Sequence, residues 1–390
     1  MRTRRPFAGA LVCSLLIAGC GKEAGAPNQP LVGLKGSEKK AAQGLGFPTF
    51  ATKNTTRVGG ADAVADAAAV ARAVYPAETA STRPSAVTLV DAGDWRIALA
   101  SSVLMAAPVR APLLFSNGSS LPPASEAALE GLGPRGARSL AGTQVIRVGS
   151  VARPAGFKTT DVKGGDPFTV ANAVDRLSAS VRGGPSGSVV VVSADDPAFA
   201  MPAAGWAAKS GNPILFVKRD VVPPATRAAL RRHDKPRIYV LGPGKAVSAK
   251  VLTQLRKLGA VKRIEGADPV RNAIAFAHYA DSSFGWGVVD PGHGLVFAST
   301  SQPLDAAAAA PLSATGTYGP LLLVDDAKSL PRPLVGYLLN LQPGYRKDPV
   351  RGVYNHGWLI GDERAISAVS QARLDSLLEI APVDRTSIAR

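Results

Sequence analysis

A short glycine-aspartate element occurs three times in this chain and limits the folds that it can adopt. It reads VGGAD at Val58–Asp62, VKGGD at Val162–Asp166 and IEGAD at Ile264–Asp268. The copies follow one another at intervals of about 100 residues, and a fixed period of this size indicates tandem structural repeats. We therefore expect three similar modules within the 390 residues of the chain.

Each copy of the element is predicted to end a short strand and to begin a helix. The small residues at its centre allow a tight turn, and aspartate is a preferred N-cap because its carboxylate accepts hydrogen bonds from the first N–H groups of a helix. Pro167 and Pro269 then stand at the first helical position, where a missing N–H is harmless. We therefore interpret three aspartates as structural helix caps, in preference to catalytic groups: Asp62, Asp166 and Asp268.

Apolar strands and helical stretches alternate after each element. The first strand is TLVDA at 88–92, SVVVVSA at 188–194 and GLVFAS at 294–299; the second is PLLF at 112–115, PILF at 213–216 and PLLL at 320–323; the third is VIRVG at 145–149, IYVLG at 238–242 and GWLIG at 357–361. Continuous apolar strands that alternate with helices are typical of parallel sheets covered on both faces. The predicted fold class is α/β, with one small parallel sheet in each of three tandem repeats, at 55–157, 158–261 and 262–382. A C-terminal tail follows at 383–390, and the extra length of the third copy is assigned to a surface loop at 342–353.

The N-terminus has the organisation of a bacterial export signal. Arg2, Arg4 and Arg5 precede an apolar stretch, Phe7–Ala18, that is too short to span a membrane permanently. The stretch closes with Leu16–Cys20 (LIAGC), which resembles a lipobox, in which Cys20 carries lipid on its thiol and becomes the first residue of the mature protein. A plain secretory signal that ends near a cysteine is the alternative.

The export signal predicts how the mature chain is anchored. We predict a signal peptide at 1–19, an acyl (palmitate-type) lipid anchor on Cys20, a flexible tether at 20–54, and a location at the outer face of the cytoplasmic membrane. The other cysteine, Cys13, lies in the removed segment, so the mature protein forms no disulfide. The lipid is then its only predicted membrane attachment.

The repeats resemble a known family. The glycine-aspartate opening, the PILF strand and the IYVLG strand that ends in glycine are similar to the cell wall-binding repeat type 2 family, whose members usually carry three tandem copies. The resemblance covers about residues 55–382. It implies one small α/β module per copy, three modules around a pseudo-threefold axis, and non-covalent attachment to anionic polymers of the cell wall.

This chain departs from the family pattern at two places. Family copies usually have Arg-Tyr or Arg-Phe after the aspartate, whereas these copies have Ala-Val at 63–64, Pro-Phe at 167–168 and Pro-Val at 269–270. The Asp-Ala turn of the family is present only as Asp305-Ala306, and the matching residues in the other copies are Ile97 and Phe199. The ligand specificity of the family is therefore not carried over to this chain.

The net charge of +16 indicates an anionic partner: nucleic acid, anionic lipid or an acidic wall polymer. Nucleic acid is disfavoured, because an exported lipoprotein seldom meets it and because aromatic residues, which stack on bases, make up only 6% of the chain. The surplus is concentrated in the middle copy, with 16 basic and 7 acidic residues, whereas the first copy has 9 and 7 and the third has 12 and 13.

Five basic residues of the middle copy are candidates for contact with an anionic polymer. Lys218 and Arg219 follow the PILF strand and should lie at the carboxyl ends of the sheet, where parallel α/β domains bind ligands. Lys245 follows a Gly-Pro-Gly turn and is expected on the same edge, where glycine-rich turns suit anions. The remaining candidates of this cluster are Arg231 and Arg232. The alternative is that these charges lie on outward helix faces and keep the protein soluble.

Patterns that indicate catalysis are scarce. His233, His278, His293 and His356 lack metal-ligand spacing, and no G-x-S-x-G sequence or P-loop occurs. Carboxylate pairs at strand ends, Asp195-Asp196 and Asp325-Asp326, do not recur in all copies and are interpreted as solvated turn residues. We therefore predict no enzyme activity, no catalytic residue, no metal and no cofactor.

The leading hypothesis is an exported lipoprotein that binds an anionic cell wall polymer through three α/β repeats and links membrane and wall. The second hypothesis is a solute-binding lipoprotein of a transporter, which predicts two lobes around one cleft. The third is a cell envelope hydrolase that uses strand-end carboxylates such as Asp325.

Overall fold

A computed structural model describes residues 50–383, and all of them fall within one structural unit. The predicted signal peptide, Cys20 and residues 21–49 of the predicted tether lie outside the described residues. Residues 50–54, the end of the predicted tether, are part of the fold, because strand β1 (Phe50–Ala51) pairs antiparallel with β2 (Thr55–Val58). Asn54 fixes the turn before β2, since its backbone N–H donates to a carboxylate oxygen of Asp375, 2.6 Å away.

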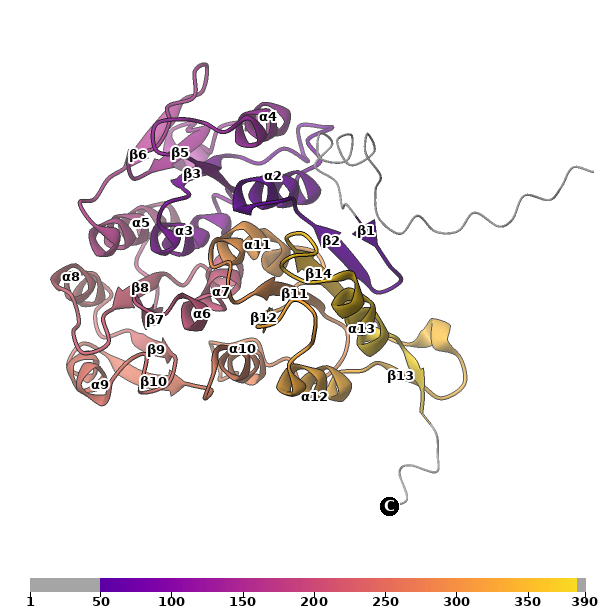
Figure 1. The fold of residues 1–390 in the computed structure, drawn as a ribbon. Helices are drawn as coiled ribbons and strands as arrows, with labels where there is room; N and C mark the ends of the chain where they lie inside the picture. The colour runs from indigo at the N-terminus through magenta and orange to yellow at the C-terminus, as the bar shows by residue number, and fades with distance from the viewer. Residues whose placement is uncertain (1–49, 384–390) are drawn as a thin grey trace, which may run out of the picture. The chain divides into compact units, whose positions relative to one another are not determined.

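Three small parallel sheets form the framework (Figure 1). Sheet 1 has the order β4-β3-β5-β6, with β3 (Val87–Asp91), β4 (Leu113–Ser116), β5 (Val145–Val148) and β6 (Thr159–Val162). Sheet 2 has the order β8-β7-β9-β10, with β7 (Ser188–Ser193), β8 (Ile214–Val217), β9 (Arg237–Leu241) and β10 (Ala260–Ile264). Sheet 3 has the order β12-β11-β14-β2-β1, with β11 (Gly294–Ser299), β12 (Leu321–Val324) and β14 (His356–Ile360), and only its edge strand β1 is antiparallel. The predicted α/β class with one small parallel sheet per repeat is confirmed.

The last strand of each sheet comes from the next copy of the sequence repeat. Strand β6 pairs with β5 and runs into the second glycine-aspartate element, and β10 pairs with β9 and runs into the third. The first copy completes the pattern, because β2 pairs in parallel with β14 from the far end of the chain, with Thr56 opposite Trp358. A strand from the start of the described chain therefore completes the sheet that is formed near the end of the chain.

Each glycine-aspartate element leads into a helix that bridges two sheets. These helices are α2 (Ala63–Val74), α5 (Pro167–Arg182) and α10 (Pro269–His278). Helix α2 contacts α4 and β4 beside sheet 1 and α11 beside sheet 3, and α5 contacts α3 beside sheet 1 and α8 and β8 beside sheet 2. Helix α10 likewise contacts α6 beside sheet 2 and α12 and β12 beside sheet 3. The junctions between modules are thus built from equivalent parts.

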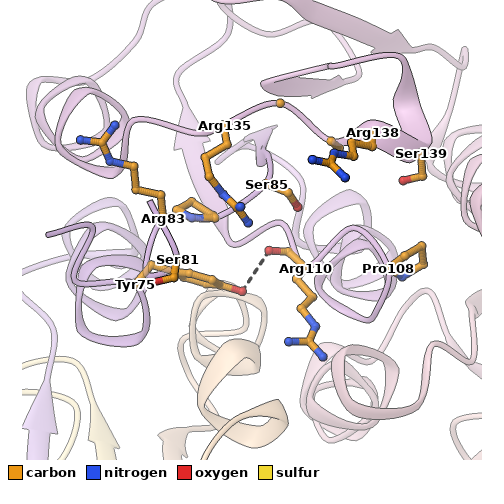
Figure 2. A pocket seen from close by; sticks show the side chains of 12 residues that line it. Tyr75, Ser81, Arg83, Ser85, Pro108, Arg110, Arg135, Arg138 and Ser139 are labelled. Carbon is orange, nitrogen blue, oxygen red and sulfur yellow. Dashed lines mark hydrogen bonds between the residues drawn. The ribbon is translucent and has the colours of Figure 1, made fainter. Parts of the chain in front are cut away.

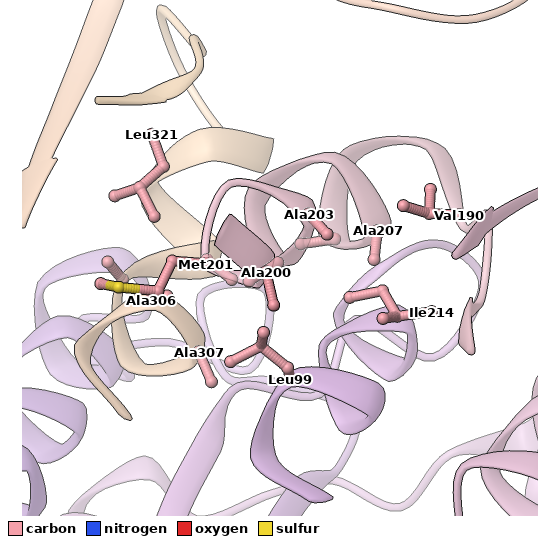
Figure 3. Close-up of a cluster of buried hydrophobic side chains, with 14 of the residues drawn as sticks. Leu99, Val190, Ala200, Met201, Ala203, Ala207, Ile214, Ala306, Ala307 and Leu321 are labelled. Atoms are coloured by element: carbon pink, nitrogen blue, oxygen red, sulfur yellow. The ribbon is translucent and has the colours of Figure 1, made fainter. Parts of the chain in front are cut away.

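The helices that follow the first strand of each sheet meet in the interior. They are α3 (Trp95–Ser101) with the 3-10 helix η1 (Ser102–Met105), α6 (Pro197–Ala200) with α7 (Ala203–Ser210), and α11 (Leu304–Ala314). Helices α7, α11 and η1 contact one another, which is the contact pattern that a threefold arrangement predicts. Figure 3 shows Leu99, Ala200 and Ala307, one from each copy, in this buried cluster.

Small residues allow these central helices to approach closely. A Cβ atom added to Gly205 of α7 would lie 2.8 Å from the Cβ of Ser313 in α11, so a larger residue would push the two helices apart. Ala306–Ala310 are all buried, which marks α11 as a helix enclosed on all sides.

The outer helices and the long loop complete the fold. The second strand of each sheet is followed by α4 (Pro123–Leu132), α8 (Pro224–Arg232) or α12 (Arg332–Asn340), and the third strand of sheets 2 and 3 by α9 (Ala249–Arg256) or α13 (Ala368–Leu378). Residues 149–158 of the first copy form no helix. The predicted loop at 342–353 contains β13 (Gly344–Tyr345), which pairs with β15 (Ala381–Pro382), and the 3-10 helix η3 (Pro349–Arg351). Among residues 50–383, no helix is both long and apolar enough to cross a membrane.

Candidate functional site

The three repeated aspartates lie at helix N-termini, where their carboxylates accept backbone hydrogen bonds. Asp62 accepts from the N–H of Ala65 (2.9 Å), and Asp166 from that of Thr169 (2.8 Å). Asp268 accepts from the N–H of Arg271 in the same way (2.8 Å). This geometry is that of N-caps, and it uses the carboxylates for the fold.

Three of the basic candidates lie together at the carboxyl edge of sheet 2. Lys218 and Arg219 directly follow β8, and the Nε of Arg219 donates to the backbone oxygen of Lys245 (3.2 Å), in the loop after β9. Two carboxylates are close by: the N–H of Arg219 donates to Asp195 (3.4 Å), and its guanidinium pairs with Asp220 (3.3 Å). This edge therefore carries positive charge that is partly neutralised.

The other two candidates lie at the opposite, amino edge of sheet 2. Arg232, near the end of α8, pairs with the buried carboxylate of Asp175 in α5, and the Nε2 of His233 lies 2.9 Å from the same carboxylate. These contacts tie α5 to α8, so Arg232 has a structural role.

Arg231 instead lines a cavity of about 350 Å³ with Arg227, Asp234, Lys235 and Lys257. Because this cavity lies at the amino edge, the five predicted residues form two separate groups.

A larger basic cavity, of about 770 Å³, lies at the amino edge of sheet 1 (Figure 2). Its lining includes Arg83 before β3, Arg110 before β4, and Arg135 and Arg138 before β5. None of the lining residues within the described chain is acidic. The side chains of Arg110, Arg135 and Arg138 have no hydrogen-bond or ion-pair partner among residues 50–383, so their charge is available to a ligand.

Backbone contacts hold the segments of this cavity together. The N–H of Arg135 donates to the oxygen of Pro84 (3.1 Å), and that of Gly136 to the oxygen of Ser85 (2.8 Å). The hydroxyl of Tyr75 donates to the backbone oxygen of Arg110 (2.9 Å), the contact drawn in Figure 2. Arg110 has a φ of 50°, a left-handed conformation that costs a residue with a side chain about 1–2 kcal/mol.

The sequence did not predict this group of arginines. They are spread over residues 83–138 of the first copy, which has nearly balanced charges. The signal that identifies them is position: each precedes a strand of sheet 1, and the amino ends of parallel strands meet at one edge.

Two buried aspartates face each other where the first and third copies meet. Asp66 of α2 and Asp305 of α11 are both fully buried, and one oxygen of Asp66 accepts a hydrogen bond from the N–H of Gly60 (2.6 Å). Burial is the main cause that raises the pKa of Asp66, and the neighbouring carboxyl of Asp305 raises it further. Burial also raises the pKa of Asp305. Since neither side chain is exposed, we expect the pair to affect the stability of the folded protein.

The strand-end carboxylates take part in local turns. Asp326 accepts from the N–H of Lys328 (2.8 Å) and from the hydroxyl of Ser329 (3.0 Å), which lowers its pKa. Asp196 accepts from the hydroxyl of Ser193 (3.2 Å). In the described part of the chain, no group of three or more His, Cys, Asp or Glu side chains is placed to hold a metal ion.

Comparison with known proteins shows which protein family the middle of the chain resembles. Residues 162–252 match the family model of cell wall binding domain 2 (CWB2), a segment that runs from the end of β6 into α9 and contains β7, β8 and β9. The resemblance inferred from the sequence is confirmed over these residues, which are similar to cell wall binding domain 2. No curated protein matches the chain significantly.

Two solved structures share the fold over most of the chain. Cwp6 from Clostridium difficile is 17% identical, with a TM-score of 0.63 over 84% of this chain and 48% of its own. Cwp8 from Clostridium difficile is 18% identical, with a TM-score of 0.63 over 84% of this chain and 52% of its own. The chain therefore spans about half the length of these solved structures.

Proposed function

We propose that this chain binds an anionic polymer of the cell wall without catalysing a reaction, and that a lipid on Cys20 holds it at the outer face of the cytoplasmic membrane. The observation that carries the proposal is the match of residues 162–252 to a cell wall binding domain. That segment has 13 basic and 6 acidic residues, and this positive charge suits a partner with regularly spaced negative charges. A location in the cell envelope follows from the same match.

The proposed contact surface in the middle copy is the carboxyl edge of sheet 2. Lys218 and Arg219 are exposed and lie beside the loop that carries Lys245. Carboxyl edges are where open parallel sheets place their ligands. Arg232 is excluded from this surface, because its guanidinium is engaged by Asp175.

The arrangement of three equivalent modules around buried helices also argues against a solute-binding lipoprotein. A solute-binding lipoprotein predicts two lobes around one cleft, whereas three sheets are joined here through α7, α11 and η1. A repeated scaffold suits a polymer, because several similar surfaces can bind successive units of one chain and increase the overall affinity.

Wall binding is tested with the full chain carrying Cys20→Ala, which removes the lipid. We expect retention on purified cell walls that falls as NaCl rises from 50 to 500 mM, because salt screens contacts between exposed charges (about 10 Å range at 0.1 M). Retention that is insensitive to salt, or equal on walls stripped of anionic polymer, would contradict the proposal.

The same assay locates the contact surface. The triple variant Lys218→Gln, Arg219→Gln, Lys245→Gln is expected to weaken wall binding about tenfold, since three exposed charge contacts of about 0.5 kcal/mol each sum to that factor. The matched control removes three charges from the amino edge of the same sheet: Arg231→Gln, Lys235→Gln, Lys257→Gln. Equal weakening by both triples would show that only net charge matters.

The lipid anchor gives a further expected result. In cells, Cys20→Ala should move the protein out of the membrane fraction and abolish its labelling with radioactive palmitate, because a thiol at residue 20 is the predicted acceptor. Cys13→Ala is the control and should leave both unchanged, since Cys13 lies in the predicted signal peptide. Membrane association that persists in the Cys20 variant would favour the plain secretory signal.

A further inference from the structure

We propose that the arginine cavity at the amino edge of sheet 1 is a second, separate site that binds a phosphate group. Its ligands are Arg110, Arg135 and Arg138, with Arg83 on the rim. The inference deepens the proposed function and rests on it only for the source of the phosphate, which is a unit of a phosphate-bearing wall polymer.

The choice of side chains indicates phosphate. All four basic residues of the cavity are arginines, and the serines Ser81, Ser85 and Ser139 add hydroxyl groups to the lining. A planar guanidinium donates two parallel hydrogen bonds to phosphate, a geometry that lysine cannot reproduce. Figure 2 shows the side chains of Arg135 and Arg138 directed toward the Ser85 region.

The lack of acidic side chains around the cavity also favours an anionic ligand. Like charges that line one cavity repel each other, and the cavity has no acidic lining residue within the described chain to offset them. Arg83 is partly satisfied, because its Nε donates to the oxygen of Ala77 (3.3 Å) and its guanidinium lies near Gly133 at the C-terminus of α4. The other three arginines have no such contacts and are exposed, so their guanidinium groups are free to bind an anion.

The cavity is built by features that the second copy lacks. Arg135 and Arg138 lie on residues 133–144 between α4 and β5, whereas only residues 233–236 join α8 to β9 in sheet 2. Arg110 occupies the position of Gly211 in sheet 2, since each stands three residues before its strand. Both are left-handed, with φ of 50° and 73°, and glycine adopts this conformation without strain. An arginine at this position therefore carries backbone strain that a glycine would not.

Arg110 needs only a rotamer change to complete the site. Its guanidinium extends away from Ser85 in Figure 2, on an exposed side chain. Exposed side chains change rotamer within nanoseconds, so Arg110 can turn into the cavity when a phosphate arrives.

The test measures binding by calorimetry at 50 mM NaCl, using the full chain with Cys20→Ala. The probes are inorganic phosphate, a short poly(glycerol phosphate) and polygalacturonate, whose charges are carboxylates. We expect poly(glycerol phosphate) to bind and the double variant Arg135→Gln, Arg138→Gln to weaken it at least tenfold. The control Arg231→Gln, Lys257→Gln removes the same charge from the smaller cavity of sheet 2 and should change affinity less than twofold.

A second variant separates binding from folding. Arg110→Gly is expected to weaken poly(glycerol phosphate) binding several-fold while keeping or raising the melting temperature, because glycine relieves the left-handed strain. A merely structural role for Arg110 would instead lower the melting temperature and leave binding unchanged, which would count against the site.

The outcomes distinguish free phosphate from a phosphate polymer as the ligand, and they test the phosphate site and the proposed function independently. Binding of inorganic phosphate as well as the oligomer supports a general phosphate site, and binding of the oligomer alone supports a polymer site. Equal affinity for polygalacturonate, equal losses in the double variant and its control, or no binding of any probe would overturn the inference. If phosphate binds while the chain is not retained on walls, the proposed function fails and the phosphate site stands.

Discussion

Replacing Arg57 with alanine is expected to lower the free energy of unfolding by about 3–5 kcal/mol, as removal of one partner from a buried charged network does. Arg57 lies in β2 and is only 4% exposed. Its guanidinium donates to the backbone oxygens of Gly361 (3.0 Å), Asp362 (2.9 Å) and Ile366 (2.6 Å), and its Nε donates to the side-chain oxygen of Gln371 (3.1 Å). Without the guanidinium, these acceptors lose their donor in the protein interior.

The position of Arg57 explains why the effect should be large. It connects β2, the first parallel strand of the fold, to the loop after β14 and to α13. It therefore holds together the two ends of the described chain. Chemical unfolding with urea, followed by circular dichroism, measures the change.

Arg263 provides a matched control for this prediction. It occupies the same place in β10, one residue before the end of the strand, and donates to the backbone oxygen of Val247, the counterpart of Ile366. Its guanidinium also pairs with the exposed carboxylate of Glu265 (3.3 Å), so it serves fewer buried acceptors than Arg57. Arg263→Ala should therefore cost about 1 kcal/mol, near the value of a typical hydrogen bond. Similar losses in the two variants would refute a special role for the closing strand.

Local chemistry explains which parts of the fold could be predicted from the sequence. The run Val189–Val192 is apolar at every position, and in the structure all four residues are fully buried in β7. A strand of this kind needs no distant information to be recognised. The helix starts are equally local, because Asp166 and the proline after it specify an N-cap without reference to the rest of the chain.

Non-local pairing explains what the sequence concealed. The segment TTRV at Thr55–Val58 does not indicate which sheet it joins, and its partner β14 lies near the other end of the chain. Arg57 in such a strand would ordinarily be assigned to solvent, and only the loop after β14 supplies the acceptors that make its burial favourable.

The same limit applies to the candidate site. Lys218 and Arg231 are close in sequence, yet helix α8 carries the chain from one edge of sheet 2 to the other between them. Arg110 and Arg135 are far apart in sequence, yet both line one cavity, because each precedes a strand of sheet 1. Density of charge along the chain therefore does not predict density of charge in space; position relative to strand ends does.

Replacing Asp66 with asparagine is expected to stabilise the protein at pH 7.5 by roughly 1–3 kcal/mol, given that each unit of pKa shift corresponds to about 1.4 kcal/mol. Burial raises the pKa of both Asp66 and Asp305 above the ordinary value of 3.8. The negative charges of Asp62 and Asp362 act on Asp305 in the same direction, and the positive charge of Arg57 interacts with Asp66.

The direction of the pH dependence follows from these raised pKa values. The folded protein holds protons on the pair that the unfolded chain releases above about pH 4, so the stability that this pair contributes is greatest in acid and is lost as the pH rises through the folded-state pKa values. An asparagine at residue 66 has no proton to lose, and its amide group can donate to Asp305 while its oxygen accepts from Gly60. The stability of the variant should therefore depend less on pH, with the largest gain at neutral and alkaline pH and little difference near pH 4.

At the junction between the second and third copies, an asparagine already stands at the position of Asp66. Asn272 of α10 corresponds to Asp66: its side-chain oxygen accepts from the N–H of Gly266 (3.2 Å), and its amide donates to the backbone oxygen of Phe199 (3.4 Å), the residue that corresponds to Asp305.

The reverse substitution, Asn272→Asp, is thus the matched control, because it places a buried carboxyl against a carbonyl oxygen. It should destabilise the protein at pH 7.5 and recover stability as the pH falls and the carboxyl takes up a proton. Thermal unfolding of wild type and both variants between pH 4 and 9 checks the pair of expectations, and parallel pH profiles for all three proteins would contradict a buried carboxyl pair at the closure.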